Sequence, residues 1–283
     1  MLERLLKKEV YDSIVKSGVR PETLFEIRLR IGRPLVICDK RGSRLAGSFS
    51  RVYTATAEDV EYTLSVASGH SVYAVSEQLI RGYVSYKGGV RIGVCGEGVT
   101  EDGRLTALKN ISGLNIRIPH EVKGCAECMR GIISRGLKNI LVVSPPGGGK
   151  TTLLRELTRL YSDAAYNILV IDERNEIAAV TEGVAALDVG EFTDVISGAE
   201  KALVYRNVIR SMRPDMIVTD ELFCADDAAG VRDIIRSGVR VMASVHAKDL
   251  ADLENTEFSG VLRVFDVFVI LDKPGGAIKV VER

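Results

Sequence analysis

The chain has 283 residues, enough for two domains of ordinary size. Hydrophobic residues make up 46% and charged residues 27%, which is typical of a globular protein that buries a sizeable core. Because 38 Lys and Arg balance 38 Asp and Glu, the formal net charge is zero and gives no general reason to expect nucleic acid or anionic lipid as a partner.

The chain carries no sequence signal for export or membrane insertion. Its charged N-terminus, residues 1–9, fits neither a signal peptide nor a transit peptide, and its apolar runs are far shorter than the ~20 residues of a membrane-spanning helix. We therefore expect a cytoplasmic protein that reaches a membrane only through partners. The five cysteines do not indicate a disulfide framework, and the lone Cys125–Cys128 pair lacks a second pair of zinc ligands.

The first 120 residues predict a small α+β domain. Apolar residues at helical spacing predict a helix over residues 1–18, and alternating apolar and charged residues predict a half-buried strand over 24–31. Thr56 is the predicted N-cap of a helix that ends at Ser68. Further elements are expected as strands over 34–38, 45–53 and 111–118, a helix over 74–81, and a hairpin over 82–94 that turns at Gly88-Gly89.

The pattern changes between residues 120 and 126. Helix-length segments now alternate with short apolar strands, which are expected at 140–143, 168–171, 216–219, 239–244 and 267–271. Strands that are buried on both faces and separated by helices predict a parallel sheet covered by helices. We therefore predict a smaller N-terminal α+β domain, residues 1–122, followed by a C-terminal α/β domain, residues 123–283.

A glycine-rich loop follows the first of these apolar strands. Residues 140–152 read ILVVSPPGGGKTT, and a helix is expected over 151–161, so the order is strand, loop, helix. In that context the motif predicts a P-loop, whose backbone N–H groups and helix N-terminus bind phosphate. The predicted nucleotide-binding residues are Pro146, Gly147, Gly148, Gly149, Lys150, Thr151 and Thr152.

Within this loop, Lys150 is expected to reach the β- and γ-phosphates of ATP, and the Thr151 hydroxyl to bind Mg²⁺. The domain is accordingly predicted to be a RecA-like P-loop ATPase core. Ser144 stands where the usual motif has glycine, and we expect this change to perturb the loop without abolishing binding. The alternative interpretation is a surface turn that merely resembles the motif.

Acidic residues follow two of the other predicted strands. Asp220 and Glu221 end the strand after Pro214, as in a Walker B motif, so Asp220 is predicted to hold Mg²⁺ and Glu221 to activate the attacking water. One of Glu173 and Glu176 is expected to face the γ-phosphate, and the sequence leaves open which one. An exposed Asp-Glu turn is the alternative for the Walker B pair.

Histidine and arginine residues complete the candidate set. His246 follows a core strand and is either a γ-phosphate sensor or a structural histidine. ATPases of this type also need a positive charge beyond the γ-phosphate, often from a neighbouring subunit. Arg210, which shares a predicted helix face with Arg206, is our candidate, although Arg213 and the arginines of the first domain stay open: Arg28, Arg30, Arg81, Arg91 and Arg117.

Several segments together resemble the stage III sporulation protein AA family. They are residues 25–34, 82–84, 88–93, 111–118, 123–125, 145–155, 171–177 and 209–215. That family is similar to the hexameric ATPases of type II and type IV secretion systems. In this comparison, residues 172–176 fall at an acidic box and His246 at a histidine box, whereas Phe192 stands where this family is expected to have arginine.

The resemblance implies a function for the whole chain. It implies an ATP- and Mg²⁺-dependent hexameric motor on the mother-cell side of a secretion-like channel between mother cell and forespore. The expected partners are further copies of the chain and membrane-embedded proteins of the sporulation complex. Two alternatives stay open: a nucleotide-binding scaffold with little turnover, which the Phe192 departure keeps possible, and a nucleic-acid-associated P-loop ATPase. Nucleic acid is not expected as a partner, and a small-molecule kinase fits less well.

Overall fold

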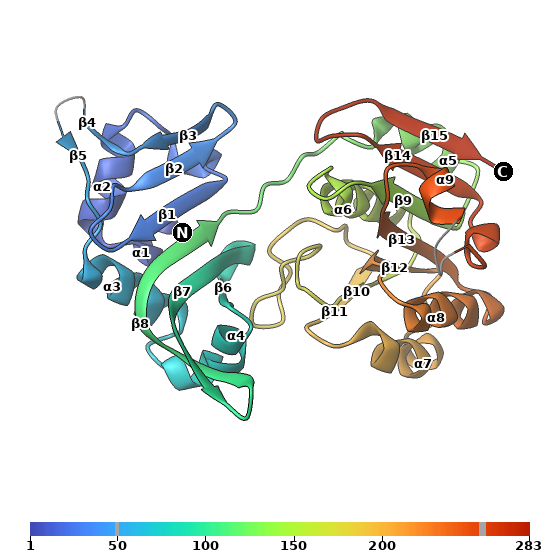
Figure 1. Ribbon diagram of the computed structural model, residues 1–283. Helices are drawn as coiled ribbons and strands as arrows, with labels where there is room; N and C mark the ends of the chain where they lie inside the picture. The colour runs from blue at the N-terminus through green and yellow to red at the C-terminus, as the bar shows by residue number, and fades with distance from the viewer. Residues whose placement is uncertain (49–50, 255–258) are drawn as a thin grey trace. The chain divides into compact units, whose positions relative to one another are not determined.

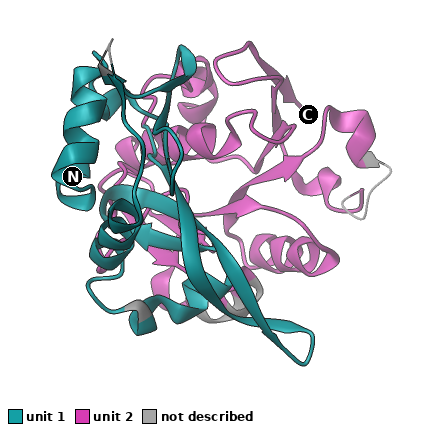
Figure 2. Ribbon diagram, turned by 60° about the vertical axis from the view of Figure 1, so that its left-hand side comes forward, with its two compact units in different colours: residues 1–120 teal, residues 121–283 magenta. Residues whose placement is uncertain are grey.

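The computed structural model describes residues 1–48, 51–254 and 259–283 (Figure 1), with backbone only at residues 48, 72, 202, 203, 206, 207 and 254. The chain divides into two compact units, Met1–His120 and Glu121–Arg283 (Figure 2). This division lies two residues before the domain boundary expected from composition. Each unit has its own buried hydrophobic cluster or clusters, as expected for separate folding units.

Unit 1 is built on a six-stranded antiparallel sheet. Its strand order is β3-β2-β1-β8-β7-β6. The strands are β1 Glu26–Arg30, β2 Val36–Asp39, β3 Gly42–Leu45, β6 Tyr83–Tyr86, β7 Val90–Glu101 and β8 Arg104–Arg117. In β1, Ile27 and Leu29 are fully buried while Arg28 and Arg30 are exposed, which confirms the predicted alternation.

The helices of unit 1 depart from prediction at one point. They are α1 Leu2–Leu5, α2 Lys8–Lys16, α3 Ala57–Ala67 and α4 Ser76–Ile80. The single helix predicted over 1–18 is divided because Leu6 is extended, with φ −98° and ψ 148°. The predicted Thr56 cap is confirmed: its Oγ1 accepts the Asp59 N–H at 3.3 Å, and the Asp59 carboxylate accepts the Thr56 N–H at 2.8 Å.

Two strand predictions in unit 1 need correction. The strand expected over 45–53 is replaced by β4 Gly47–Ser48 and β5 Arg51–Val52, and residues 49 and 50 lie outside the described residues. β8 begins at Arg104, not at residue 111, and pairs with β7 through a turn at 102–103. The outer part of this hairpin is largely exposed on both faces, so it lacks the apolar alternation that marks a half-buried strand.

Unit 2 contains a seven-stranded sheet with the order β11-β10-β12-β13-β9-β14-β15. The strands are β9 Ile140–Ser144, β10 Ile168–Asp172, β11 Thr193–Ser197, β12 Met216–Glu221, β13 Arg240–His246, β14 Val267–Leu271 and β15 Ile278–Glu282. All neighbours pair in parallel except β14 and β15. All five predicted strands are present, whereas β11 was not predicted because three of its five residues are polar and none of the five is fully buried.

Helices cover both faces of this sheet. They are α5 Arg130–Ile133, α6 Lys150–Asp163, α7 Lys201–Met212, α8 Ala225–Arg236 and α9 Leu250–Glu254. Residues of α6 pack in one hydrophobic cluster, and residues of α7 and α8 pack in another on alternate strand positions. The central strands are therefore buried on both faces, which is why they read as continuous apolar runs. Short 3-10 turns lie at Pro21–Thr23, Val72–Val75, Lys87–Gly89, Glu127–Met129 and Leu262–Val264.

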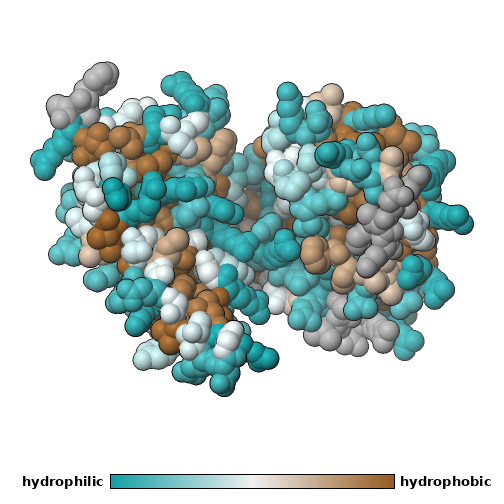
Figure 3. Space-filling model, in the orientation of Figure 1, coloured by the Kyte–Doolittle hydropathy of each residue, from teal (hydrophilic) through white to brown (hydrophobic). Residues whose placement is uncertain are grey.

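Hydrophilic and hydrophobic residues are mixed on the face seen in Figure 3. The most exposed large hydrophobic side chains are Tyr73 in unit 1 and Phe223 in unit 2, at 92% and 75%. Within the described ranges, every helix is too short or too polar to cross a bilayer. All five cysteines are free thiols.

Candidate nucleotide-binding site

The predicted site residues of unit 2 gather at the carboxyl ends of four adjacent strands. The P-loop follows β9, the acidic segment follows β10, Asp220 and Glu221 end β12, and His246 ends β13. These strands neighbour one another in the order β10-β12-β13-β9. Because they run in parallel, their carboxyl ends share one edge of the sheet, which is where open α/β sheets bind ligands.

The P-loop has the backbone of a phosphate-binding turn. Gly147 and Gly149 have φ values of +73° and +98°, a region that side chains other than glycine rarely adopt. Gly149 is the N-cap of α6, and Lys150 begins the helix. Thr151 and Thr152 follow, both half-buried, in its first turn. The free N–H groups of this helix start are the donors that a phosphate requires.

Ser144 is accommodated by close contact with Gly148. The serine is fully buried, and its hydroxyl donates to the Pro145 carbonyl at 3.1 Å. A Cβ placed on Gly148 would come within 1.8 Å of the Ser144 Oγ. In this loop the Ser144 hydroxyl therefore occupies the space that a side chain at residue 148 would need.

Three predicted residues form a chain of polar contacts across the site. The Lys150 Nζ lies 2.7 Å from His246 Nδ1, and His246 Nε2 lies 3.2 Å from Glu221 Oε1. We assign the neutral histidine tautomer in which Nδ1 accepts from the lysine and Nε2–H donates to the glutamate, since this satisfies both partners. Arg174, which the sequence interpretation missed, lies 3.5 Å from the other carboxylate oxygen of Glu221.

The electrostatics around Lys150 favour an anionic ligand. Burial lowers the pKa of the Lys150 ammonium, while the nearby charges of Glu221 and Glu176 raise it. The residue is only 8% exposed. A phosphate that replaced His246 as its partner would compensate this buried charge more fully, because hydrogen bonds between two charged groups are the stronger ones.

The acidic segment after β10 is held in place by a buried carboxylate. Asp172 is fully buried and accepts backbone N–H groups from Glu176, Ile177 and Ala178 at 2.8, 2.9 and 2.9 Å. On the other side, the Arg155 guanidinium of α6 donates to the carbonyls of Ile177 and Glu176 at 2.5 and 2.7 Å. The segment that carries both candidate glutamates is thereby fixed directly to the P-loop helix.

The two candidate glutamates of this segment have different surroundings. The charge of Glu176 acts on Lys150, which places it on the P-loop side of the site. The Glu173 carboxylate lies instead 3.9 Å from the ammonium of Lys201, a residue that no sequence motif singled out. The two glutamates therefore act on different lysines, Glu176 on Lys150 of the P-loop and Glu173 on Lys201.

Asp220 is a buried acid beside a β-bulge. Between Val218 and Glu221, β12 has one residue more than its partner β13, and such bulges re-aim side chains. Asp220 is 8% exposed, and its Oδ1 lies 3.4 Å from the Lys201 Nζ. Burial, together with the charges of Asp172 and Glu173, raises the pKa of Asp220 to about 6, although Lys201 acts to lower it.

Arg210 is not among the residues around Lys150. It is an exposed residue of α7 and lines a groove between α7 and α8 with Tyr205, Gly230 and Asp233. Arg210 therefore does not complete the site of its own chain. Its proposed role is limited to the site of a neighbouring subunit. The side chain of Arg206 lies outside the described residues, and Arg213 is the left-handed C-cap of α7.

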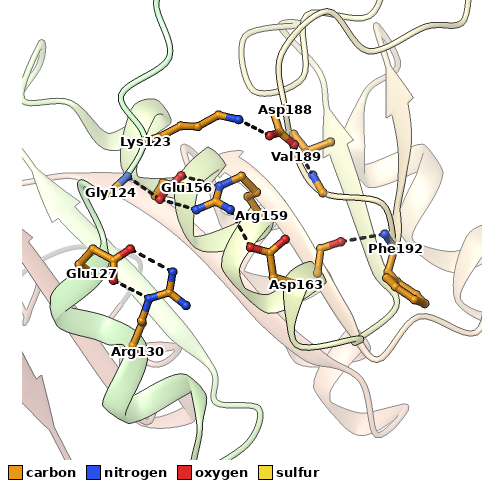
Figure 4. Close-up of polar contacts among 12 residues, drawn as sticks. Lys123, Gly124, Glu127, Arg130, Glu156, Arg159, Asp163, Asp188, Val189 and Phe192 are labelled. Atoms are coloured by element: carbon orange, nitrogen blue, oxygen red, sulfur yellow. Dashed lines mark hydrogen bonds and ion pairs between the residues drawn. The ribbon is translucent and has the colours of Figure 1, made fainter.

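Phe192 stands on a loop that α6 anchors. Its N–H donates to the Ser162 Oγ at 2.8 Å, and its side chain is 50% exposed (Figure 4). The same loop contributes Asp188, whose carboxylate pairs with Lys123 at 2.6 Å. The side chain at position 192 is therefore presented at the surface, and its aromatic ring takes no part in the polar contacts described above.

A second set of contacts in Figure 4 ties the first segment of unit 2 to α6. The Gly124 N–H donates to Glu156 at 2.7 Å, and Glu156 pairs with Arg159 at 2.8 Å. Glu156 is 4% exposed, and its hydrogen bond with Arg159 raises the pKa of that guanidinium. Arg159 also pairs with Asp163 at 2.6 Å. The first residues of unit 2 are thus hydrogen-bonded to α6, the helix that begins at the P-loop.

We expect Asp220→Asn to stabilise the nucleotide-free protein at neutral pH. The folded pKa of about 6 exceeds the ordinary value of 3.8, so the folded state binds this proton more readily and loses stability as pH rises through that interval. Asparagine cannot ionise, so a gain of about 2–3 kcal/mol should be complete above pH 6 and shrink toward pH 4. Thermal unfolding in EDTA at pH 4.5 and 7.5 checks this, and an equal gain at both values would contradict it.

Comparison with known proteins identifies the family. The profile of the family described as "Sporulation stage III, protein AA" matches residues 1–282. The chain belongs to this family. The Stage III sporulation protein AA of Bacillus subtilis (strain 168) is 36% identical over 234 residues, which are 81% of this chain and 75% of the relative. The resemblance drawn from the sequence segments is confirmed.

Solved structures agree with the fold. The ATPase DotB of Yersinia pseudotuberculosis has a TM-score of 0.60 at 13% identity, covering 92% of this chain and 74% of DotB. The pilus retraction motor PilT has a TM-score of 0.59 at 16% identity, covering 96% of this chain and 80% of PilT. At these identities the likeness shows a shared fold, and the predicted α/β class is confirmed.

Proposed function

We propose that this sporulation stage III protein AA family member binds and hydrolyses ATP as the motor of a secretion-like channel between mother cell and forespore. The observation that carries the proposal is the contact chain Lys150–His246–Glu221, which joins the P-loop to a Walker B acid through one imidazole. A phosphate-binding lysine and a carboxylate that can accept a proton are two of the groups that ATP hydrolysis requires of the protein.

The oxygen donors available at the site suit Mg²⁺. Thr151 lies in the first turn of the P-loop helix and Asp220 near the end of β12, and hydroxyl and carboxylate oxygens are the ligands that this ion takes together with phosphates. Thr151 and Asp220 would hold the ion, and the bound ion would neutralise part of the negative charge of the phosphates. The predicted cofactors, ATP and Mg²⁺, are kept on this basis.

The protein groups act in a defined order in this proposal. Lys150 exchanges its contact with His246 for the β- and γ-phosphates, and the backbone N–H groups of residues 147–152 enclose them. Glu221 then accepts the proton of the attacking water, while His246 and Arg174 hold the Glu221 carboxylate in place. Glu176, whose charge already acts on Lys150, faces the γ-phosphate side.

We further propose a hexamer in which a neighbouring subunit completes each site. The similarity of the fold to a pilus motor and a DotB ATPase supports an oligomeric motor. Residues 1–122 would then supply contacts to neighbouring subunits or to membrane-embedded channel proteins, on the mother-cell side. Arg210 is our candidate for the arginine offered across the interface, because it is exposed on α7. Nucleic acid is not proposed as a partner.

A scaffold that binds ATP with little turnover is the second candidate. The specific observation in its favour is Phe192, an exposed ring at a position where arginine is expected in this family. If that position serves catalysis in relatives, this chain lacks a positive charge there and has to supply it from another residue.

Steady-state ATP hydrolysis across a protein concentration series tests the proposal. We expect turnover per chain to rise with concentration, because an intersubunit site forms only in the oligomer. The Glu221→Gln variant serves as the control that gives the background rate of ATP hydrolysis. Tight Mg-ATP binding with no turnover at any concentration would support the scaffold, and absence of nucleotide binding would overturn both candidates.

A further inference from the structure

Lys201 lies among three acidic side chains at the edge of the candidate site. Its Nζ is 3.4 Å from Asp220 Oδ1, 3.5 Å from Asp227 Oδ2 and 3.9 Å from Glu173 Oε2. It also donates a hydrogen bond to the main-chain carbonyl of Glu221. One ammonium group thus contacts the ends of β10 and β12 and the first turn of α8.

Two of the three acids around Lys201, Asp220 and Asp227, are buried, so these two contacts are weakly screened by solvent, whereas the Glu173 side chain is 37% exposed. The side chains of Lys201 and Asp227 are 9% and 5% exposed, and that of Asp220 is 11% exposed. Removal of one partner from such a cluster leaves the other charges uncompensated in a poorly solvated place. Without the ammonium, the carboxylates of Glu173, Asp220 and Asp227 would repel one another and separate.

The local sequence does not favour a lysine at this position. Lys201 is the first residue of α7, and a positive charge at a helix N-terminus opposes the helix dipole. A residue that is unfavourable for its own helix but contacts three acids of neighbouring elements is retained for those contacts rather than for the helix. Local departures of this kind are expected at functional sites.

Lys201 contacts two consecutive residues at the β12 bulge. It lies next to the carboxylate of Asp220, which is within the bulge, and donates to the carbonyl of Glu221, where regular pairing resumes. The extra residue between Val218 and Glu221 changes the directions of the side chains that follow it. An ammonium fixed at this bulge therefore determines where the carboxylates of Asp220 and Glu221 point.

Asp227 ties the same ammonium to α8. Its Oδ2 also accepts the N–H groups of Phe223 and Cys224 at 2.7 and 3.2 Å, which caps the start of that helix. Lys201 therefore contacts an acid that is itself held rigidly by backbone donors. Because Asp227 is held in place, its contact restricts the position of the Lys201 ammonium, and the ammonium in turn restricts the position of Asp220.

We propose that Lys201 is a positioning residue of the nucleotide site, which holds Asp220 and the β12 bulge in the geometry that the metal of a Mg-nucleotide requires. The inference rests on the proposed function. It assigns to Lys201 no contact with nucleotide: the lysine acts through Asp220, Glu173 and the Glu221 carbonyl. If this is so, replacing Lys201 should reduce the increase in nucleotide affinity that Mg²⁺ gives, while the affinity measured without metal stays the same.

The test measures binding of a fluorescent ATP analogue in EDTA and in Mg²⁺, for wild type and for Lys201→Met. We expect the affinity in EDTA to change less than about twofold, because the P-loop contacts of Lys150 remain. The ratio of the two affinities should fall about tenfold, as for loss of a ligand-orienting group. Lys201→Arg, which keeps the charge, should recover part of that ratio, and Lys279→Met, an exposed lysine of β15, should leave it unchanged.

Each outcome has a defined meaning. A lowered melting temperature with an unchanged or larger Mg²⁺ ratio would show that Lys201 is only a structural tie and would overturn the inference. Lys201→Gln, which keeps a donor for the Glu221 carbonyl, serves if the methionine variant does not fold, and failure of both to fold also overturns a role confined to the site. If wild type itself binds no nucleotide, or shows no Mg²⁺ effect, the proposed function fails instead.

Discussion

Glu221→Gln is expected to lower steady-state ATP hydrolysis about 100-fold or more, the usual contribution of a general base. The amide cannot accept a proton from water, yet it keeps the shape of the side chain and an oxygen for His246 Nε2–H. Binding of Mg-ATP should change little, because Lys150, Thr151 and Asp220 are untouched. Hydrolysis assays and analogue binding on the same preparations separate the two quantities.

Controls for this variant distinguish the other acids. Glu191→Gln, an exposed residue before β11, should retain wild-type turnover. Glu176→Gln and Glu173→Gln should each lose less than Glu221→Gln, since the Glu221 carboxylate contacts the imidazole next to Lys150 and is the proposed proton acceptor. A larger loss at Glu176 or Glu173 than at Glu221 would reassign the residue that activates water.

Gly148→Ala is expected to weaken nucleotide binding by roughly 10- to 100-fold, which corresponds to an overpacking cost of about 1–3 kcal/mol. The new methyl group would meet the Ser144 Oγ at 1.8 Å, with the Pro145 carbonyl at 3.1 Å, so either the buried Ser144 hydroxyl has to rotate away or the loop has to move. Titration of a fluorescent nucleotide measures the loss. Thermal unfolding should change much less, because the loop lies at the edge of the sheet and not in its core.

The physical cause can be isolated with a second substitution. Ser144→Gly removes the clashing hydroxyl, so the double variant should recover most of the affinity, a coupling of about 1–2 kcal/mol for residues in contact. Gly147→Ala is the matched control: no atom lies within 4 Å of its added Cβ, and only its φ of +73° opposes the change. Ser144→Gly should not rescue it. Equal rescue of both alanines would refute the steric explanation.

Local sequence was sufficient wherever burial is uniform along a segment. The five apolar strands of unit 2 and the Thr56 capping box of α3 follow from side chains close together in the chain. It was insufficient for β11 and for the first half of β8, which lack apolar alternation. Those strands form because neighbouring strands supply their hydrogen bonds, a non-local effect that periodicity cannot register.

The amino-acid sequence was sufficient to predict a P-loop, a Walker B acid pair and membership of the family, from the segments that resemble it. These are local patterns, since a glycine-rich turn between strand and helix needs only adjacent residues to specify its chemistry. The family assignment rests on the same kind of information and was confirmed across residues 1–282.

Which of these residues contact one another depends on the tertiary fold and does not follow from any local pattern. The Lys150–His246 contact joins residues 96 positions apart, and Lys201 reaches three acids from other elements. The structure likewise separated Glu176 from Glu173 and placed Arg210 away from Lys150. The cause is the strand order: β10 lies beside β12, and β13 beside β9, although other strands separate the members of each pair in the chain, and the shared edge of these four strands creates the site.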